Sequence, residues 1–388
     1  MECIIYFSQN LEKNISPVTN IASIPLINRI LLSCIRAGVT KFYLLGAPRE
    51  EITTTIKSDP RINKPWEWIQ NTNNISNKNI LFYSNEYLVN HKVLSNFLEK
   101  SGDTQNILSI NKEKIAVAIV EKNLIETYSN SLEQKIFSLP AYETTGFSLK
   151  ISQPIKKVET RLLNSLQSPL EGTVDVYFNR PLGRLITLPL VKLKANPNLV
   201  SIFSILTGII GSILLVNYEY WITITASLLI QISAIIDCID GDIARIQFRE
   251  STLGKWLDIT GDNIVNIMIF ISLALREYRL FHNWTPIIFG AMLAGGTIIS
   301  FLLVIYSKVH LPKISKEGQN SDILANLQNF IDKLTNRDFT VLIIIGAIIG
   351  NFTWFLWLAA IGIQFFWLLL LFLVIMAQKK LMCCSKIK

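Results

Sequence analysis

The stretch "DCIDGDIARIQFRESTLGKWLDITGD", residues 237–262, places acidic side chains directly after "WITITASLLIQISAII" at 221–236, a run that is almost purely apolar. A carboxylate beside a membrane-like segment is costly, because a charged group loses its hydration there. The stretch nevertheless contains Asp237, Asp240, Asp242, Asp258 and Asp262. This arrangement predicts membrane helices whose ends carry a charged site.

The composition supports a membrane protein, since half of the 388 residues are hydrophobic and only 17% are charged. The charges are unevenly distributed, because polar residues are mixed with short apolar runs before about residue 170 and long apolar runs dominate after Leu199. We therefore expect a soluble domain at 1–150, a linker at 151–178 and a membrane domain at 179–388.

A helix needs about 20 apolar residues to cross the hydrocarbon core of a bilayer. The long run 339–377 has room for two such helices, with a break expected near Ala359–Gly362. These two, with the four single runs, predict an all-α domain of six transmembrane helices. The four single runs lie near 198–217, 220–238, 263–281 and 285–307.

The segment "RPLGRLITLPLVKLKANPN" at 180–198 mixes arginine and lysine with leucine, isoleucine and valine. This mixture is typical of an amphipathic helix that lies on the membrane surface. We expect Pro197 to end it.

Lysine and arginine collect on the cytoplasmic side of membrane proteins. With the N-terminal domain in the cytoplasm, the outside loops hold only Arg276 and Arg279, and the other basic residues near the spans fall inside. We therefore expect an integral protein of the cell membrane, with the aspartate stretch on the cytoplasmic side. The net charge of +8 then favours a lipid bilayer over nucleic acid as the partner.

The spacing of four aspartates predicts a metal site. Asp237 and Asp240 are three residues apart, Asp258 and Asp262 are four apart, and helical residues at these spacings share a face. If a short turn joins the two helices, their carboxylates converge and need cations to cancel their repulsion. Oxygen ligands suit Mg²⁺, Mn²⁺ or Ca²⁺ rather than zinc, and two such ions can grip a pyrophosphate. The alternative is a solvated loop with ordinary acidic residues.

The same stretch resembles the signature D-x2-D-G-x2-A-R-x8-G-x3-D-x3-D of the CDP-alcohol phosphotransferases. The glycines Gly241 and Gly254 and the pair Ala244 and Arg245 fill its remaining positions without a gap, whereas Asp242 is outside the pattern. The likeness covers about 175–388, and "NPNLVS" at 196–201 resembles the family's Pro-Asn-x-x-Thr segment, with Ser201 in place of threonine.

The resemblance implies transfer of a phosphoryl-linked alcohol from a CDP-alcohol donor to the hydroxyl of a polar or phosphorylated alcohol, with release of CMP. Asp237, Asp240 and Asp258 would hold two Mg²⁺ or Mn²⁺ ions, and Asp262 would also reach a metal and act as general base. Arg245 would hold donor phosphate. The other residues expected on the donor side are Asn198, Ser201, Gly241, Ala244 and Gly254. We also expect a homodimer.

The N-terminal segment predicts a Rossmann-like α/β domain. Strands are expected at 3–7 and 39–46, with a helix at 24–38 between them. The form "PL…R…L…AG" from Pro25 to Gly38 resembles the second element of sugar-phosphate nucleotidyltransferases. Such a domain is fused to a CDP-alcohol phosphotransferase in bifunctional inositol-phosphate cytidylyltransferase/di-inositol-phosphate-phosphate synthases.

This domain departs from the nucleotidyltransferase pattern at its phosphate-binding loop. The segment 8–23 contains no glycine, and without glycine the backbone cannot approach phosphates closely. The family's metal-binding aspartate has no clear counterpart, since Ser84, Asn85 and Glu86 follow the later strand. We expect a domain that no longer transfers nucleotides, with an unusual active version as the alternative.

The acceptor of such an enzyme is often phosphorylated, so Lys255, Lys308 and Arg337 are candidate acceptor-binding residues, with membrane-anchoring cations as the alternative. Two other functions compete for the chain as a whole. A transporter or cation-binding protein could use the acidic cluster as an ion site, and a scaffold could carry a dead site. The sequence shows neither repeated halves nor a lost signature residue. It does not identify the donor or the acceptor.

Overall fold

The protein is described by a computed structural model that covers the chain except residues 8–14, 71–74, 76–78, 102–103, 122–123, 126–131, 145, 152–153, 167–171, 311–338 and 386–388. It forms two compact units, Met1–Leu166 with Ile246–Phe248, and Gln167–Arg245 with Arg249–Lys388. The predicted linker at 151–178 contains helix α6 (Ile155–Asn164), which is part of the first unit.

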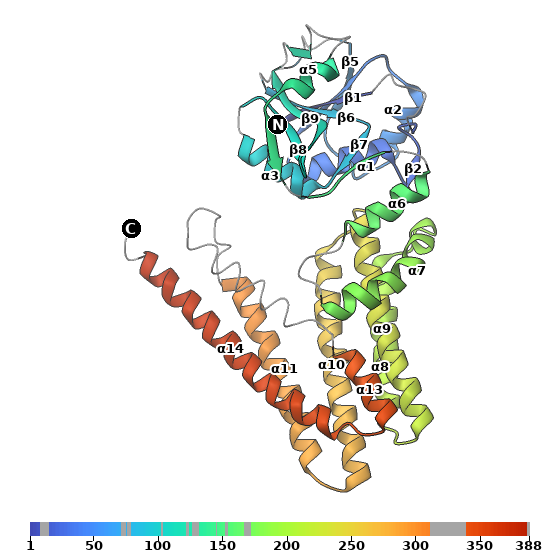
Figure 1. Cartoon of the computed structure of the whole chain (residues 1–388), viewed down its shortest axis with the longest axis vertical. Helices are drawn as coiled ribbons and strands as arrows, with labels where there is room; N and C mark the ends of the chain where they lie inside the picture. The colour runs from blue at the N-terminus through green and yellow to red at the C-terminus, as the bar shows by residue number, and fades with distance from the viewer. Residues whose placement is uncertain are drawn as a thin grey trace. The chain divides into compact units, whose positions relative to one another are not determined.

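The first unit is an α/β domain (Figure 1). It is built on a mixed seven-stranded sheet in the order β10-β8-β9-β6-β1-β4-β5. The strands of this sheet are β1 (Glu2–Tyr6), β4 (Lys41–Leu45), β5 (Trp66–Ile69), β6 (Asn79–Ser84), β8 (Asn106–Ile110), β9 (Glu113–Glu121) and β10 (Ala141–Thr144). Two small sheets pair β2 (Asn20–Ile21) with β3 (Ile24–Pro25) and β7 (Tyr87–Val89) with β11 (Ser148–Lys150). The remaining helices of the unit are α1 (Leu26–Arg36), α2 (Glu50–Lys57), α3 (His91–Ser101) and α5 (Leu132–Ser138).

The predicted strand–helix–strand unit is confirmed, because β1 and β4 are parallel neighbours and α1 connects them. Cys3 and Ile5 belong to one apolar core and Ile4 to the other. A strand buried on both faces is typical of the centre of such a sheet. The helix begins at Leu26 rather than at residue 24, because Ile24 and Pro25 pair with β2.

Arg29 on α1 anchors the small hairpin that precedes this helix. Its guanidinium is buried and donates to the carbonyl oxygen of Ile21 at 2.8 Å. Burial, together with the charge of Arg61, lowers the pKa of Arg29 to about 9. Glu159 accepts from the backbone N–H of Ala22 in the same hairpin at 2.9 Å. Arg29 therefore fastens the β2–β3 hairpin to α1.

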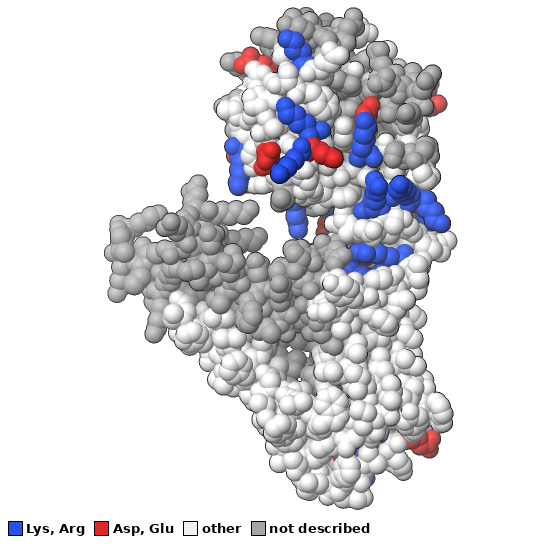
Figure 2. Space-filling model, viewed as in Figure 1, with Lys and Arg blue, Asp and Glu red and all other residues white. Residues whose placement is uncertain are grey.

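The second unit is helical, as predicted, and on the face shown in Figure 2 most of its described surface carries neither acidic nor basic side chains. Five helices of the described chain are long and apolar enough to cross a membrane: α8 (Pro197–Leu214), α9 (Tyr220–Ile246), α10 (Thr252–Phe281), α11 (Thr285–His310) and α14 (Thr353–Ser385). The sixth expected span corresponds to α13 (Thr340–Ile349), whose 10 residues extend only about 15 Å. Within the described residues, five helices therefore have the length expected of a span, and the sixth apolar helix is shorter.

The break in the last apolar run lies at 350–352, so the prediction of a break near Ala359–Gly362 was wrong. Gly350 adopts φ 78°, and its N–H donates to the carbonyl of Gly346 at 2.8 Å, which ends α13. Asn351 then accepts from the N–H of Thr353 at 2.8 Å and begins α14. Gly362 lies inside α14 and tolerates the helical conformation.

The amphipathic segment begins with a π-helical turn, η1 (Asp175–Asn179), and continues as α7 (Arg180–Lys192). The prediction that Pro197 ends this helix was wrong. Pro197 instead starts α8, where the first backbone N–H groups have no partner within the helix, so proline loses no hydrogen bond there. The buried face of α7 includes the small residues Gly183 and Thr187, whereas Leu185 and Ile186 are exposed. Large apolar side chains that point outward suit contact with lipid.

Arg276 and Arg279, expected in an outside loop, belong to the last turns of α10. The helix ends only at His282, whose φ of 50° is left-handed and whose N–H donates to the carbonyl of Tyr278. Arg276 is buried, so it is not a residue of a solvent-exposed loop.

Helices α8 and α9 pack closely through small residues. Ser204 and Ser233 each donate a hydroxyl hydrogen bond to the other's backbone carbonyl at 2.8 Å. A Cβ atom at Gly208 would lie 2.8 Å from the hydroxyl of Ser233, so glycine permits this approach. The contact fixes α8 beside the helix that carries Asp237 and Asp240.

Candidate metal centre

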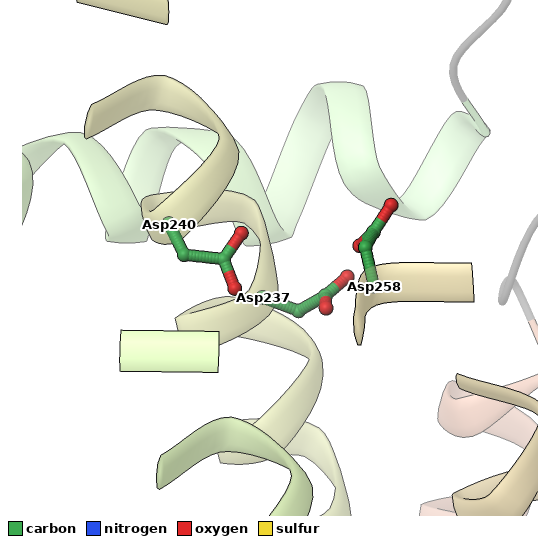
Figure 3. A group of neighbouring side chains, drawn as sticks. All are labelled: Asp237, Asp240 and Asp258. Carbon is green, nitrogen blue, oxygen red and sulfur yellow. The ribbon is translucent and has the colours of Figure 1, made fainter. Parts of the chain in front are cut away.

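Three of the four expected aspartates come together at the ends of two helices. Asp237 and Asp240 lie near the end of α9, and Asp258 lies near the start of α10 (Figure 3). One carboxylate oxygen from each lies within 4.8 Å of the others. Asp262 is one helical turn beyond Asp258 and is not part of this group.

The connection between the two helices explains why these residues meet. After α9, the N–H of Arg249 donates to the carbonyl of Ala244 at 2.9 Å. Ser251 then caps α10, because its hydroxyl accepts from the N–H of Gly254 at 2.9 Å. The chain thus reverses within a few residues, which places the second turn of α10 beside the last turns of α9.

The three carboxylates form an acidic centre that suits a hard cation. Asp240 is buried, and Asp237 and Asp258 are half-buried. Carboxylates held this close repel one another, and partial burial strengthens the repulsion. The group consists of oxygen donors, which Mg²⁺, Mn²⁺ and Ca²⁺ prefer. The residues present therefore fit a divalent cation.

Two of the expected donor-side residues lie next to each other. A Cβ atom at Gly254 would lie 3.1 Å from Oδ1 of Asn198, so a side chain there would displace this amide. Asn198 lies in the first turn of α8, and its N–H donates to the side chain of Asn196 at 3.0 Å. Ser201 is buried, and its hydroxyl donates to the carbonyl of Pro197 at 3.2 Å.

The guanidinium of Arg245 folds back across Gly241. Its Nη2 atom is 3.1 Å from the position that a Cβ of Gly241 would occupy. Glycine at this position therefore leaves room for the guanidinium. Ala244, the other small residue of the motif, is half-buried on the same helix.

Sequence reasoning missed the partners of Asp242. Its Oδ1 accepts from Nη1 of Arg180 at 2.6 Å and from Nη2 of Arg245 at 3.4 Å. Asp242 lies within the quoted stretch but outside the family pattern, and Arg180 belongs to the segment interpreted as a surface helix. Nothing in the local sequence signals this pair, because 62 positions separate its members.

The acceptor candidates are only partly covered by the structure. Lys255 is exposed in the first turn of α10. The side chain of Lys308 and the whole of Arg337 lie outside the described residues.

The fold and the acidic centre together define a class of protein, an integral membrane domain with a carboxylate site built at the ends of neighbouring helices. Comparisons with known proteins show which family this region is similar to. Residues 194–318 match the model of the CDP-alcohol phosphatidyltransferase family, so this part of the chain is similar to a family of phosphate-group transferases. The resemblance predicted from the aspartate motif is confirmed.

The curated relatives include two proteins named bifunctional IPC transferase and DIPP synthase. The relative from Aquifex aeolicus is 25% identical over 42% of this chain and 37% of its own length. The relative from Thermococcus kodakarensis is 31% identical over 47% of this chain and 41% of its own length. An archaetidylinositol phosphate synthase from Aeropyrum pernix is 29% identical over 29% of this chain and 54% of its own length. The match thus spans less than half the length of the first two relatives.

Among solved structures, HddC from Yersinia pseudotuberculosis aligns with 42% of this chain and 99% of its own length. The sequence identity is 14% and the TM-score is 0.33.

Proposed function

We propose that the protein is a divalent-metal-dependent CDP-alcohol phosphotransferase. It transfers a substituted phosphate group from a CDP-alcohol to an acceptor hydroxyl and releases CMP. The observation that carries the proposal is the meeting of Asp237, Asp240 and Asp258, within a region that matches the family model. The position of these acids at helix ends, rather than in the middle of a span, disfavours a transporter.

The proposed metal ligands are Asp237, Asp240 and Asp258, with Asp262 completing the set for two Mg²⁺ or Mn²⁺ ions. Bound cations would offset the charge of the donor's pyrophosphate and of the leaving CMP. Asp262 accepts the proton of the acceptor hydroxyl as the oxygen attacks the donor phosphorus. The P–O bond to CMP then breaks, and CMP leaves with its electron pair.

The donor-binding role is assigned to the residues around this centre. Arg245 offers a bidentate guanidinium to donor phosphate, and Gly241 and Ala244 keep the surface beside it open. Asn198, Ser201 and Gly254 form the side of α8 and α10 that the nucleotide would meet. Lys255, Lys308 and Arg337 are proposed to receive a phosphorylated acceptor. The proposal includes a homodimer whose acidic centre and N-terminal domain face the cytoplasm.

The relative named archaetidylinositol phosphate synthase supports an inositol phosphate as the first acceptor to test. Full-length protein in detergent would receive CDP-diacylglycerol or CDP-inositol with inositol phosphate or glycerol phosphate, in all combinations. The proposal expects CMP in at least one combination, dependence on Mg²⁺ or Mn²⁺, and a product identified by mass spectrometry. Full CMP release after rigorous chelation would refute the metal assignment.

We further propose that the N-terminal domain does not make a CDP-alcohol from CTP. The loop 8–23 is free of glycine, although residues 8–14 lie outside the described part of the chain. At the carboxyl end of β1, Phe7 stacks on Trp68 with ring centroids 5.8 Å apart, and Arg49 lies over Phe7 at 5.5 Å. Phe7 directly follows β1, at the carboxyl end of the strands where such sheets bind nucleotides, and bulky side chains are packed there.

The test of this second proposal uses the full chain with CTP and inositol phosphate, in the Asp240→Asn background so that phosphotransfer does not consume the product. The expected result is no pyrophosphate above the level of a protein-free control. Pyrophosphate release that scales with protein concentration would overturn the proposal.

A further inference from the structure

The carboxylate of Asp242 joins two arginines from different helices. Arg180 of α7 and Arg245 of α9 both donate to the same oxygen, Oδ1, at 2.6 Å and 3.4 Å. The side chains of Arg180 and Asp242 are only 5% and 2% exposed, whereas that of Arg245 is 34% exposed. The Arg180 bond is therefore short and buried, and the Arg245 contact is long and partly open to solvent.

Arg180 is held in place by the packing of its own segment. Asn179, the preceding residue, accepts from Nε2 of Gln231 on α9 at 2.5 Å. A Cβ atom at Gly183, one turn later, would lie 3.1 Å from the side chain of Ile239 on α9. These contacts fasten the start of α7 to α9 on both sides of Arg180, so the Arg180–Asp242 pair is a fixed element.

Arg245 has more freedom. Its contact with Asp242 is 3.4 Å long, which is longer than an ordinary N–H···O hydrogen bond, and its own side chain is 34% exposed. Gly241 offers no side chain to confine the guanidinium, whose Nη2 lies 3.1 Å from the missing Cβ. Arg245 can therefore exchange Asp242 for another anion beside the acidic centre without a change of backbone.

We propose that Asp242 is a positioning residue for Arg245, and that Arg180 sets the strength of its hold. Because Arg180 neutralises most of the Asp242 charge, Arg245 is oriented toward the centre but remains available to the pyrophosphate of the donor. Without Arg180, Asp242 binds Arg245 as its only counter-ion and competes with the donor. The inference rests on the proposed function, in which Arg245 binds donor phosphate.

The test is a double-mutant cycle measured by calorimetric binding of CDP in Mg²⁺ to the full-length protein in detergent. Arg180→Gln should weaken CDP binding roughly tenfold, the effect of a charged hydrogen bond diverted from the ligand. In the Asp242→Asn background the same substitution should change the affinity less than about twofold, because the competing charge is gone. Lys192→Gln, an exposed cation of the same helix, is the matched control and should leave the affinity unchanged.

The conservative variant Arg180→Lys keeps the charge and should bind CDP within about threefold of wild type. An equal loss from Arg180→Gln in both backgrounds would overturn the inference, since Arg180 would then act on the donor directly or only on folding. Additive effects of Asp242→Asn and Arg245→Gln would overturn it as well. A wild-type protein that binds no CDP would instead refute the proposed function on which the inference rests.

Discussion

The two ends of helix α10 both hold acidic side chains, in opposite electrostatic settings. At its start, Asp258 meets Asp237 and Asp240 within 4.8 Å. Near its end, Glu277 is fully buried and paired, since Oε1 accepts from Arg276 at 2.6 Å and Oε2 accepts from Thr353 at 2.5 Å. The start of α10 brings three carboxylates together, whereas near its end each carboxylate oxygen of Glu277 accepts a hydrogen bond.

The paired end joins three connections of the helical unit. Arg276 also donates from Nε to the carbonyl of Asn217 at 3.2 Å, and its guanidinium lies 4.8 Å from the ring of Phe352. Residues between α8 and α9, at the end of α10 and between α13 and α14 are thereby held together. The paired acid supports the fold, whereas the three gathered carboxylates repel one another and form the group that fits a cation.

The largest effect on turnover is expected from a substitution in the acidic group at the start of α10. Asp240→Asn should lower turnover by roughly 10⁴-fold, because it removes a ligand of the cations that stabilise the transition-state charge, a contribution of several kcal/mol. The volume of the side chain is kept, so the thermal transition should stay close to that of wild type. CMP release measured beside the transition checks both statements, and near wild-type turnover would show that the metal assignment is wrong.

A second pair of variants separates the roles within the acidic end. Asp262→Asn should reduce turnover roughly 10²–10⁴-fold, the range for a lost general base, and donor binding should weaken far less. Asp237→Asn should show the reverse balance, with donor binding badly impaired. Donor affinity and turnover are measured for both variants, and equal loss of affinity would make Asp262 a metal ligand alone.

A substitution at the paired end of α10 should lower the stability of the protein and leave its turnover unchanged. Glu277→Gln leaves the buried guanidinium of Arg276 without its counter-charge, which costs about 3–5 kcal/mol. Denaturant unfolding in detergent measures the loss, and Glu219→Gln, an exposed acid near Asn217, is the matched control. CMP release per folded molecule should be unchanged, and a loss of turnover without a loss of stability would contradict the structural role.

The smallest effect concerns the break that follows α13. Gly350→Ala forces a Cβ into a left-handed conformation, at a cost of roughly 1–2 kcal/mol. Gly362→Ala, within α14, should be neutral or slightly stabilising, since nothing lies within 4 Å of the added methyl group. Denaturant unfolding of the two variants side by side tests the corrected position of the helix break. A larger loss of stability in Gly362→Ala than in Gly350→Ala would instead support the break predicted near Ala359–Gly362.

Helical spacing and the motif were enough to predict that Asp237, Asp240 and Asp258 share a site, since all three lie on two helices joined by a short turn. The parallel pairing of β1 with β4 was equally predictable from the strand–helix–strand pattern. The break at Gly350 was not, because the apolar run 339–377 offers several glycines and packing decides which one leaves the helix. The Arg180–Asp242 and Glu277–Thr353 contacts join residues distant in sequence, which no local pattern reveals.

The central claim is that the acidic end of α10 binds a divalent cation and the paired end does not. Electron paramagnetic resonance reports free Mn²⁺ directly, so titration of the full-length protein in detergent measures binding without any assumption about substrate. Wild type and Glu277→Gln should remove Mn²⁺ from solution in the same proportion to protein, and Asp240→Asn should bind it much more weakly. Undiminished Mn²⁺ binding by Asp240→Asn would contradict the account.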